Sequence, residues 1–239
     1  MAVKSLYVEP AEDPELLHWS ALECHDVFKI YRSGPVETVA LRGLDLKVEP
    51  GELVAILGPS GCGKSTLLAL AAGLDEPSAG DLRVWGRSLG RLDEVELAAY
   101  RSRDLAIVFQ SDNLWPALSA QENVAISLRL AGHGDAEAAA AQSLAAFGLS
   151  QRRSHRAAAL SGGEQQRVAI AAAAARRARL VLADEPTGEL DRHNEEIVLE
   201  ALQMLSREYN STVVVVTHSE SVAERAGRVI EIRDGKVAA

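Results

Sequence analysis

Residues Gly58–Ser65 read GPSGCGKS, and this stretch decides the fold that the rest of the chain must adopt. It fits the pattern G-x-x-x-x-G-K-[ST]. An apolar run at 53–57 precedes it and predicts a buried strand, and a run at 66–72 follows it and predicts a helix ending at Gly73. Strand, glycine-rich loop and helix are together the context that a phosphate-binding loop requires. The glycines let backbone N–H groups turn inward around phosphate oxygens, and the helix N-terminus adds partial positive charge.

The loop also supplies the side chains that such a site needs. Lys64 carries a full positive charge, and Ser65 offers a hydroxyl to Mg²⁺. The residues expected to bind the nucleotide are Gly58, Pro59, Ser60, Gly61, Cys62, Gly63, Lys64, Ser65 and Thr66.

Composition places the chain in the folded globular class. It has 239 residues, of which 47% are apolar, and its 25 basic and 34 acidic residues give a net charge of −9. An acidic surface argues against broad nucleic-acid binding, which needs a basic face. We find no signal peptide and no run near the roughly 20 apolar residues that cross a bilayer. Cys24 and Cys62 are predicted to be reduced thiols, in keeping with a cytosolic protein.

The predicted elements indicate an α/β domain with an acidic, proline-broken extension at residues 1–20 and the folded part at 21–239. Apolar runs predict strands at 22–31, 36–48, 105–109, 180–183, 212–217 and 228–232. Between residues 111 and about 163 the pattern becomes helical, with helices expected at 120–130 and 136–147. This region is interpreted as a helical subdomain inserted in the α/β core.

Two carboxylates follow the predicted strand at 180–183. The carboxyl ends of parallel strands open onto the ligand crevice, so Asp184 and Glu185 are expected to face the phosphate loop. Asp184 would hold Mg²⁺, and Glu185 would position and deprotonate an attacking water. The alternative is a pair of solvated loop acids.

A second phosphate-binding end is predicted at Leu160–Gln166, which reads LSGGEQQ. Ser161 is a good helix N-cap, and Gly162 and Gly163 leave N–H groups open at the helix start. A second such end makes sense if it binds the γ-phosphate of a nucleotide held by another subunit.

These stretches, together with His218 after a buried strand, resemble the ATP-binding-cassette (ABC) ATPase family over residues 22–236. The resemblance implies a P-loop NTPase fold: a RecA-like core, an antiparallel β-subdomain and an inserted α-helical subdomain. It also implies ATP hydrolysis with ATP and Mg²⁺, in a sandwich in which each ATP lies between the loop of one copy and Ser161, Gly162, Gly163 and Glu164 of the other.

The resemblance assigns further roles. Tyr31 would stack on adenine, with a packed strand tyrosine as the alternative, and Gln110 would touch Mg²⁺ and the attacking water. His218 would contact the γ-phosphate, and Asp191 would join the two sites while also capping a helix. Glu185, His218 and Gln110 form the expected catalytic set, and Ser65, Gln110 and Asp184 the expected Mg²⁺ ligands.

Residues 31–43 and 184–191 most resemble the ATPases of macrolide exporters, lipoprotein-release systems and a cell-division system that activates wall hydrolases. That resemblance implies a dimer with itself or a homologous ATPase, and an integral membrane permease with a large extracytoplasmic domain. The chain would then sit on the cytoplasmic face of the membrane. Two roles are expected equally for Trp115: it forms the base of a groove that receives a cytoplasmic helix of the permease, or it packs in the core of the helical subdomain. The alternative function is a soluble cassette ATPase of cluster assembly or repair.

Overall fold

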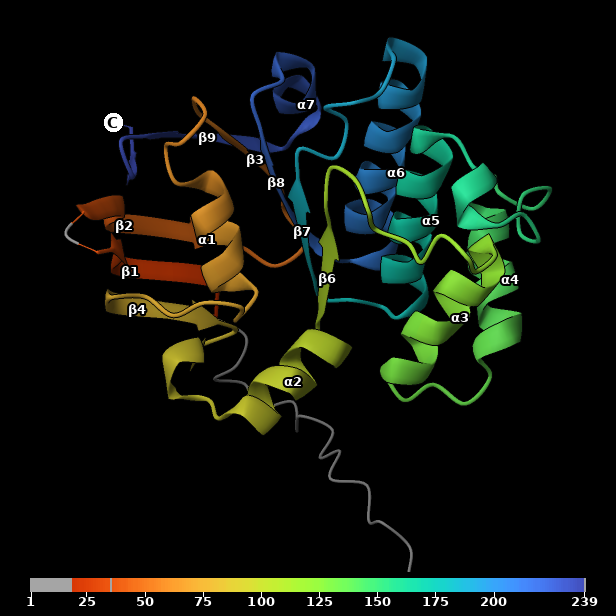
Figure 1. The fold of residues 1–239 in the computed structure, drawn as a ribbon, viewed down its shortest axis with the longest axis horizontal. Coiled ribbons are helices and arrows are strands. Elements are labelled where there is room, and N and C mark those ends of the chain that lie inside the picture. Colours follow the sequence, from red (N-terminus) through yellow and green to blue (C-terminus); the bar gives the residue numbers. More distant parts are fainter. Residues whose placement is uncertain (1–18, 35, 239) are drawn as a thin grey trace, which may run out of the picture.

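The computed structural model describes residues 19–34 and 36–238, and these form two β-sheets with helices between and beside them (Figure 1). The predicted extension at 1–20 therefore lies almost wholly outside the described residues. None of the helices in the described part of the chain combines the length and hydropathy that a bilayer crossing requires.

The central sheet has six strands in the order β10-β9-β3-β8-β7-β6. All neighbours from β9 to β6 run parallel, and only β10 pairs antiparallel to β9. The strands are β3 (Leu53–Leu57), β6 (Leu105–Val108), β7 (Leu180–Asp184), β8 (Thr212–Thr217), β9 (Arg228–Arg233) and β10 (Lys236–Val237). Every residue of β8 is buried, which explains its unbroken apolar run, since helices or a second sheet cover both faces.

The second sheet is antiparallel, in the order β2-β1-β4-β5, with β1 (Leu22–Ser33), β2 (Val36–Val48), β4 (Ala79–Val84) and β5 (Arg87–Ser88). The β1–β2 pairing contains register shifts between Cys24 and Phe28 and again after Lys29. A bulge moves the following side chains to the other face. This explains why apolar and polar residues alternate only in part along these strands.

Seven α-helices complete the described fold (Figure 1). Helix α1 lies between the antiparallel sheet and the central sheet, while α3 to α6 lie on the other side of the central sheet. The helices are α1 (Lys64–Ala71), α2 (Glu94–Arg103), α3 (Ala120–Leu130), α4 (Ala136–Ala146), α5 (Gly162–Ala175), α6 (Arg192–Tyr209) and α7 (Glu220–Arg225). Helix α1 begins two residues before the apolar run at 66–72, because its cap stands at Gly63, and α5 begins directly after its predicted cap, Ser161.

Alternate residues of the central strands belong to two different hydrophobic cores. Val213 and Val215 pack with the helices α3 to α6, whereas Val214 and Val216 pack with α1 and the antiparallel sheet. Residues 111–163 carry α3 and α4, and their apolar side chains share one continuous core with the sheet. The α/β fold class, with an antiparallel β-subdomain and helices joined to one side, is confirmed.

Candidate nucleotide-binding and catalytic site

The glycine-rich loop connects β3 to α1 and requires glycine at two positions for different reasons. Gly63 caps α1 with a left-handed backbone, φ 106°, and a Cβ there would lie 2.5 Å from the carbonyl oxygen of Ala40. At Gly58 a Cβ would lie 2.2 Å from the carbonyl oxygen of Ile232. Only glycine avoids both the strain and the overlap, so the loop can keep its backbone tight around an anion.

The side chain of Lys64 lies within the glycine-rich loop, where its positive charge is expected to act. Its side chain donates to the carbonyl oxygens of Gly58, at 2.7 Å, and Pro59, at 3.0 Å, and the residue is only 8% exposed. The ammonium group thus lies where backbone groups converge. Phosphate oxygens are stronger acceptors than neutral carbonyls, so they can replace these partners.

Ser65, in the first turn of α1, and Asp184, at the end of β7, lie close enough together for the Ser65 hydroxyl to lower the pKa of the Asp184 carboxyl group. Burial raises the pKa of Asp184, and the neighbouring Glu185 carboxylate adds to the rise, against the opposing effects of Ser65 and Lys64. A hydroxyl and a half-buried carboxylate are oxygen ligands of the kind Mg²⁺ prefers. These two residues therefore fit a Mg²⁺ site.

Glu185 follows β7 in a left-handed conformation, φ 45°, and its side chain contacts residues at the end of β8. Its backbone N–H donates to the carbonyl oxygen of Val216 at 2.9 Å. The carboxylate oxygen Oε1 lies 2.9 Å from Nδ1 of His218, and Oε2 accepts from the Thr217 hydroxyl at 2.8 Å and the His218 N–H at 3.3 Å. The structure thus brings together two residues predicted from sequence and adds Thr217, which sequence reasoning missed.

Gln110 stands just after β6, beside the loop that follows Glu185. Its Nε2 donates weakly to Oε1 of Glu189, at 3.4 Å, and approaches Gly188. Gln166, from the first turns of α5, donates to the carbonyl oxygens of Phe109 and Gln110 at 2.8 and 2.6 Å. The buried Gln166 therefore ties the segment after β6 to α5, a link that no sequence pattern pointed to.

The predicted second phosphate-binding end is a capped helix start. Ser161 Oγ accepts from the Glu164 N–H, and a Glu164 carboxylate oxygen accepts from the Ser161 N–H at 2.9 Å, which forms a capping box. A Cβ on Gly163 would lie 2.7 Å from Oδ1 of Asn194, in the first turn of α6. Glycine is needed here because α5 and α6 approach each other closely, and Asp191 caps α6 by accepting from the Asn194 N–H at 2.9 Å.

Tyr31 is near the end of β1 and 42% exposed, so its ring is not a packed core side chain. Its hydroxyl donates to Oδ2 of Asp75 at 3.0 Å, and Lys29 pairs with the same carboxylate. An exposed aromatic ring with a fixed hydroxyl suits stacking on a base.

Trp115 is 59% exposed, which removes the subdomain-core alternative for it. Its backbone is held in place by Asn123, whose Oδ1 accepts from the Trp115 N–H at 2.8 Å. The ring is therefore presented to solvent from a fixed backbone.

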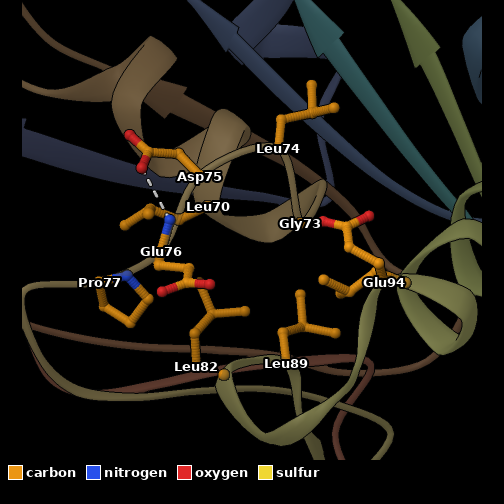
Figure 2. Close-up of a pocket in the computed structure, with 11 residues that line it drawn as sticks. Leu70, Gly73, Leu74, Asp75, Glu76, Pro77, Leu82, Leu89 and Glu94 are labelled. Carbon is orange, nitrogen blue, oxygen red and sulfur yellow. Dashed lines mark hydrogen bonds between the residues drawn. The ribbon is translucent and has the colours of Figure 1, made fainter.

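A separate pocket of about 80 Å³ lies between α1, β4 and α2 (Figure 2). Leucine side chains, including Leu74, Leu82 and Leu89, surround it together with the acidic residues Asp75, Glu76 and Glu94. Small-molecule sites usually measure about 300–1,000 Å³, so this pocket is too small for a nucleotide. The candidate site is instead the open edge formed by the glycine-rich loop and the ends of β7 and β8.

A parallel sheet, a glycine-rich loop between a strand and a helix, and acidic residues at the carboxyl end of another strand of the same sheet define a phosphate-loop nucleotide triphosphatase. The family model for ABC transporters matches residues 41–188. The chain is 46% identical to a macrolide export ATP-binding/permease protein of Azoarcus sp. over 91% of its length and 33% of that protein's. It is 45% identical to a lipoprotein-releasing system ATP-binding protein of Rhodospirillum rubrum, over 92% of its length and 98% of that protein's.

Among solved structures, a dimeric ATP-binding cassette, MJ0796, in a post-hydrolysis state bound to ADP and Pi matches with a TM-score of 0.83 and 38% identity. The match covers 91% of this chain and 97% of that one. This chain therefore belongs to the ABC transporter family and corresponds to its ATP-binding cassette. It spans about a third of the length of the macrolide-export relatives and nearly all of the lipoprotein-releasing one.

Proposed function

We propose that two copies of this chain, or one copy and a homologous ATPase, bind two ATP molecules between them and hydrolyse ATP to drive a membrane permease. The observation that carries the proposal is the clustering at one sheet edge of the lysine-bearing loop, the Ser65–Asp184 pair and the Glu185–His218 pair. A dimeric relative bound to ADP and Pi supports the two-subunit arrangement.

In the proposed reaction, Glu185 accepts a proton from the attacking water, and His218 contacts the γ-phosphate. Thr66 and the Gly58–Ser65 loop hold the triphosphate of the same copy, and Tyr31 stacks on the adenine. Ser65 and Asp184, with Gln110, would hold Mg²⁺, which neutralises developing phosphate charge when it is bound. The chemistry is mostly positioning and charge compensation, which matches a site built from fixed backbone groups.

The partner copy would complete each site through Ser161, Gly162, Gly163 and Glu164. The N–H groups of the first turn of a helix have no partners within the helix, so this tip of α5 offers donors to an anion. Asp191 lies at the start of α6, against which this tip packs, so it would connect the two sites. The triphosphate has all its hydrogen-bond donors only when the glycine-rich loop of one copy meets the start of α5 of the other. ATP binding therefore closes the dimer, and hydrolysis loosens it.

The membrane partner is proposed to be a permease with a large extracytoplasmic domain, and the work to be export, lipoprotein release or mechanotransmission. The macrolide-export and lipoprotein-releasing relatives support this reading over a soluble ATPase of cluster assembly or repair. The chain would then sit on the cytoplasmic face of the membrane, bound through the permease, with no nucleic-acid partner. Trp115 and its fixed backbone are the candidate contact for the permease.

The test is Glu185→Gln, which keeps the shape of the side chain and removes its basicity. We expect kcat to fall by about 100-fold or more, the usual contribution of a general base, while ATP still binds. ATP-bound dimers should then accumulate and be visible by size-exclusion chromatography with light scattering. The matched control is Glu224→Gln, an exposed carboxylate on α7, which should leave turnover and dimerisation unchanged. Wild-type turnover in Glu185→Gln would remove Glu185 from its role.

A further inference from the structure

Thr217 is the last residue of β8, and its side chain faces the Glu185 carboxylate. It is 1% exposed, whereas the side chain of His218, the other group that contacts this carboxylate, is 70% exposed. Of the two side chains that contact the Glu185 carboxylate, Thr217 is therefore buried in a strand and His218 is exposed to solvent.

The direction of the hydrogen bond is also fixed. The backbone N–H of Ser219 donates to Thr217 Oγ1 at 3.0 Å, which occupies an acceptor site of that oxygen. The hydroxyl proton of Thr217 remains available, and the hydroxyl donates a hydrogen bond to Oε2 of Glu185 at 2.8 Å. The loop after β8 is anchored in turn to α6, since the Ser219 hydroxyl donates to Glu195 at 3.3 Å.

We propose that Thr217 is a positioning residue for ATP hydrolysis: it anchors oxygen Oε2 of Glu185 and leaves Oε1 to face the attacking water. This rests on the proposed role of Glu185 as the base. When His218 turns to the γ-phosphate, Oε1 loses its partner, but the bond from Thr217 to Oε2 stays. The carboxylate then keeps one fixed oxygen instead of rotating freely, and displacement of a base by about 1 Å can cost about 100-fold in rate.

The test compares Thr217→Val, which keeps the shape but removes the hydroxyl, with Thr217→Ser, which keeps the hydroxyl. For Thr217→Val we expect kcat to fall by about 10- to 100-fold with an unchanged KM for ATP, because nucleotide contacts remain. ATP-dependent dimerisation should persist. Thr217→Ser should recover most of kcat, because the serine hydroxyl can make the same bond.

Thr212→Val is the matched control. Thr212 is equally buried at the opposite end of β8, and its hydroxyl oxygen accepts from the Gly51 N–H at 3.0 Å, far along the chain from Glu185. The Thr212→Val variant should lose about as much thermal stability as Thr217→Val but keep the kcat of the wild type. In a Glu185→Gln background, Thr217→Val should lower kcat no further, because Thr217 acts only by positioning the Glu185 carboxylate.

The inference is overturned if Thr217→Val keeps kcat within about twofold of wild type, or if KM rises as much as kcat falls. It is equally overturned if Thr212→Val is as impaired or Thr217→Ser fails to recover. These outcomes are separate from failure of the proposed function. An active Glu185→Gln would overturn the role of Glu185 itself, whereas an inactive Glu185→Gln beside a fully active Thr217→Val would overturn only the role of Thr217.

Discussion

Asp75 connects the loop after α1 to Tyr31, 44 residues earlier in the chain, through a hydrogen bond of 3.0 Å. Burial alone would raise the pKa of Asp75, but hydrogen bonds from Lys29, the Glu76 N–H and Tyr31, together with the Lys29 charge, hold that pKa below its ordinary value. A single carboxylate thus orients the tyrosine proposed to stack on adenine and also borders the pocket of Figure 2.

Because the folded pKa of Asp75 is lowered, its contribution to stability is present above the unfolded value, about 3.9, and is lost as pH falls through the folded pKa. Asp75→Asn should therefore lower the free energy of unfolding by about 1 kcal/mol at neutral pH, and the difference from wild type should vanish in acid. Urea denaturation across this pH range measures it. Asp135→Asn, an exposed aspartate whose side chain makes no cap at α4, should show no such trend. A difference that stays constant with pH would contradict the assignment.

At the scale of the element, the start of α6 combines a structural and a proposed functional role in one residue. Asp191 accepts from the Asn194 N–H at 2.9 Å and from the Asn194 side chain at 2.7 Å, which satisfies an orphan donor of the first turn. The same turn lies against Gly163 of α5, so the position of α6 and that of the proposed second phosphate-binding end depend on each other.

Asp191→Ala should lower the free energy of unfolding, because it removes the side chain that caps the first turn of α6. Asp191→Asn should restore most of it, since asparagine caps nearly as well. Chemical denaturation of both variants measures the cap, and ATPase activity of the Asn variant isolates the proposed communication between sites. Equal stability of the Ala variant and wild type would show that the cap contributes nothing.

At the scale of the whole molecule, the central sheet separates two cores that serve different surfaces. One core holds α1 behind the phosphate loop, and the other holds α3 to α6, which carry the proposed second phosphate-binding end and lie beside Trp115. A shift of α3 to α6 relative to the sheet would therefore move the proposed permease contact, Trp115, and the proposed nucleotide contact at the start of α5 together.

Trp115→Ala should change the free energy of unfolding by no more than about 0.5 kcal/mol, because the exposed ring makes little packing. ATPase activity of the isolated chain should stay at the wild-type level, while activity stimulated by the membrane partner in reconstituted vesicles should fall. Leu130→Ala, an exposed apolar residue at the end of α3, is the control and should keep both. Unfolding of Trp115→Ala, or full stimulation by the partner, would contradict a docking role.

Much of the fold could be predicted because it depends on local signals. Buried parallel strands such as β8 need unbroken apolar runs, and the loop at Gly58–Ser65 needs glycine where a Cβ would overlap backbone. The proximity of Glu185 and His218 could also be predicted, since each directly follows such a strand and parallel strands end at one edge; their catalytic role stays a proposal.

The tertiary structure alone decided which side chains hold these residues in place. Thr217 reads as one more buried strand residue, and the contacts of Asp75 with Tyr31 and of Gln166 with Gln110 join segments far apart in the chain. Periodicity and motifs report only neighbours along the sequence. The direction in which a buried hydroxyl or amide donates is set by whichever distant atoms the fold brings within hydrogen-bond distance.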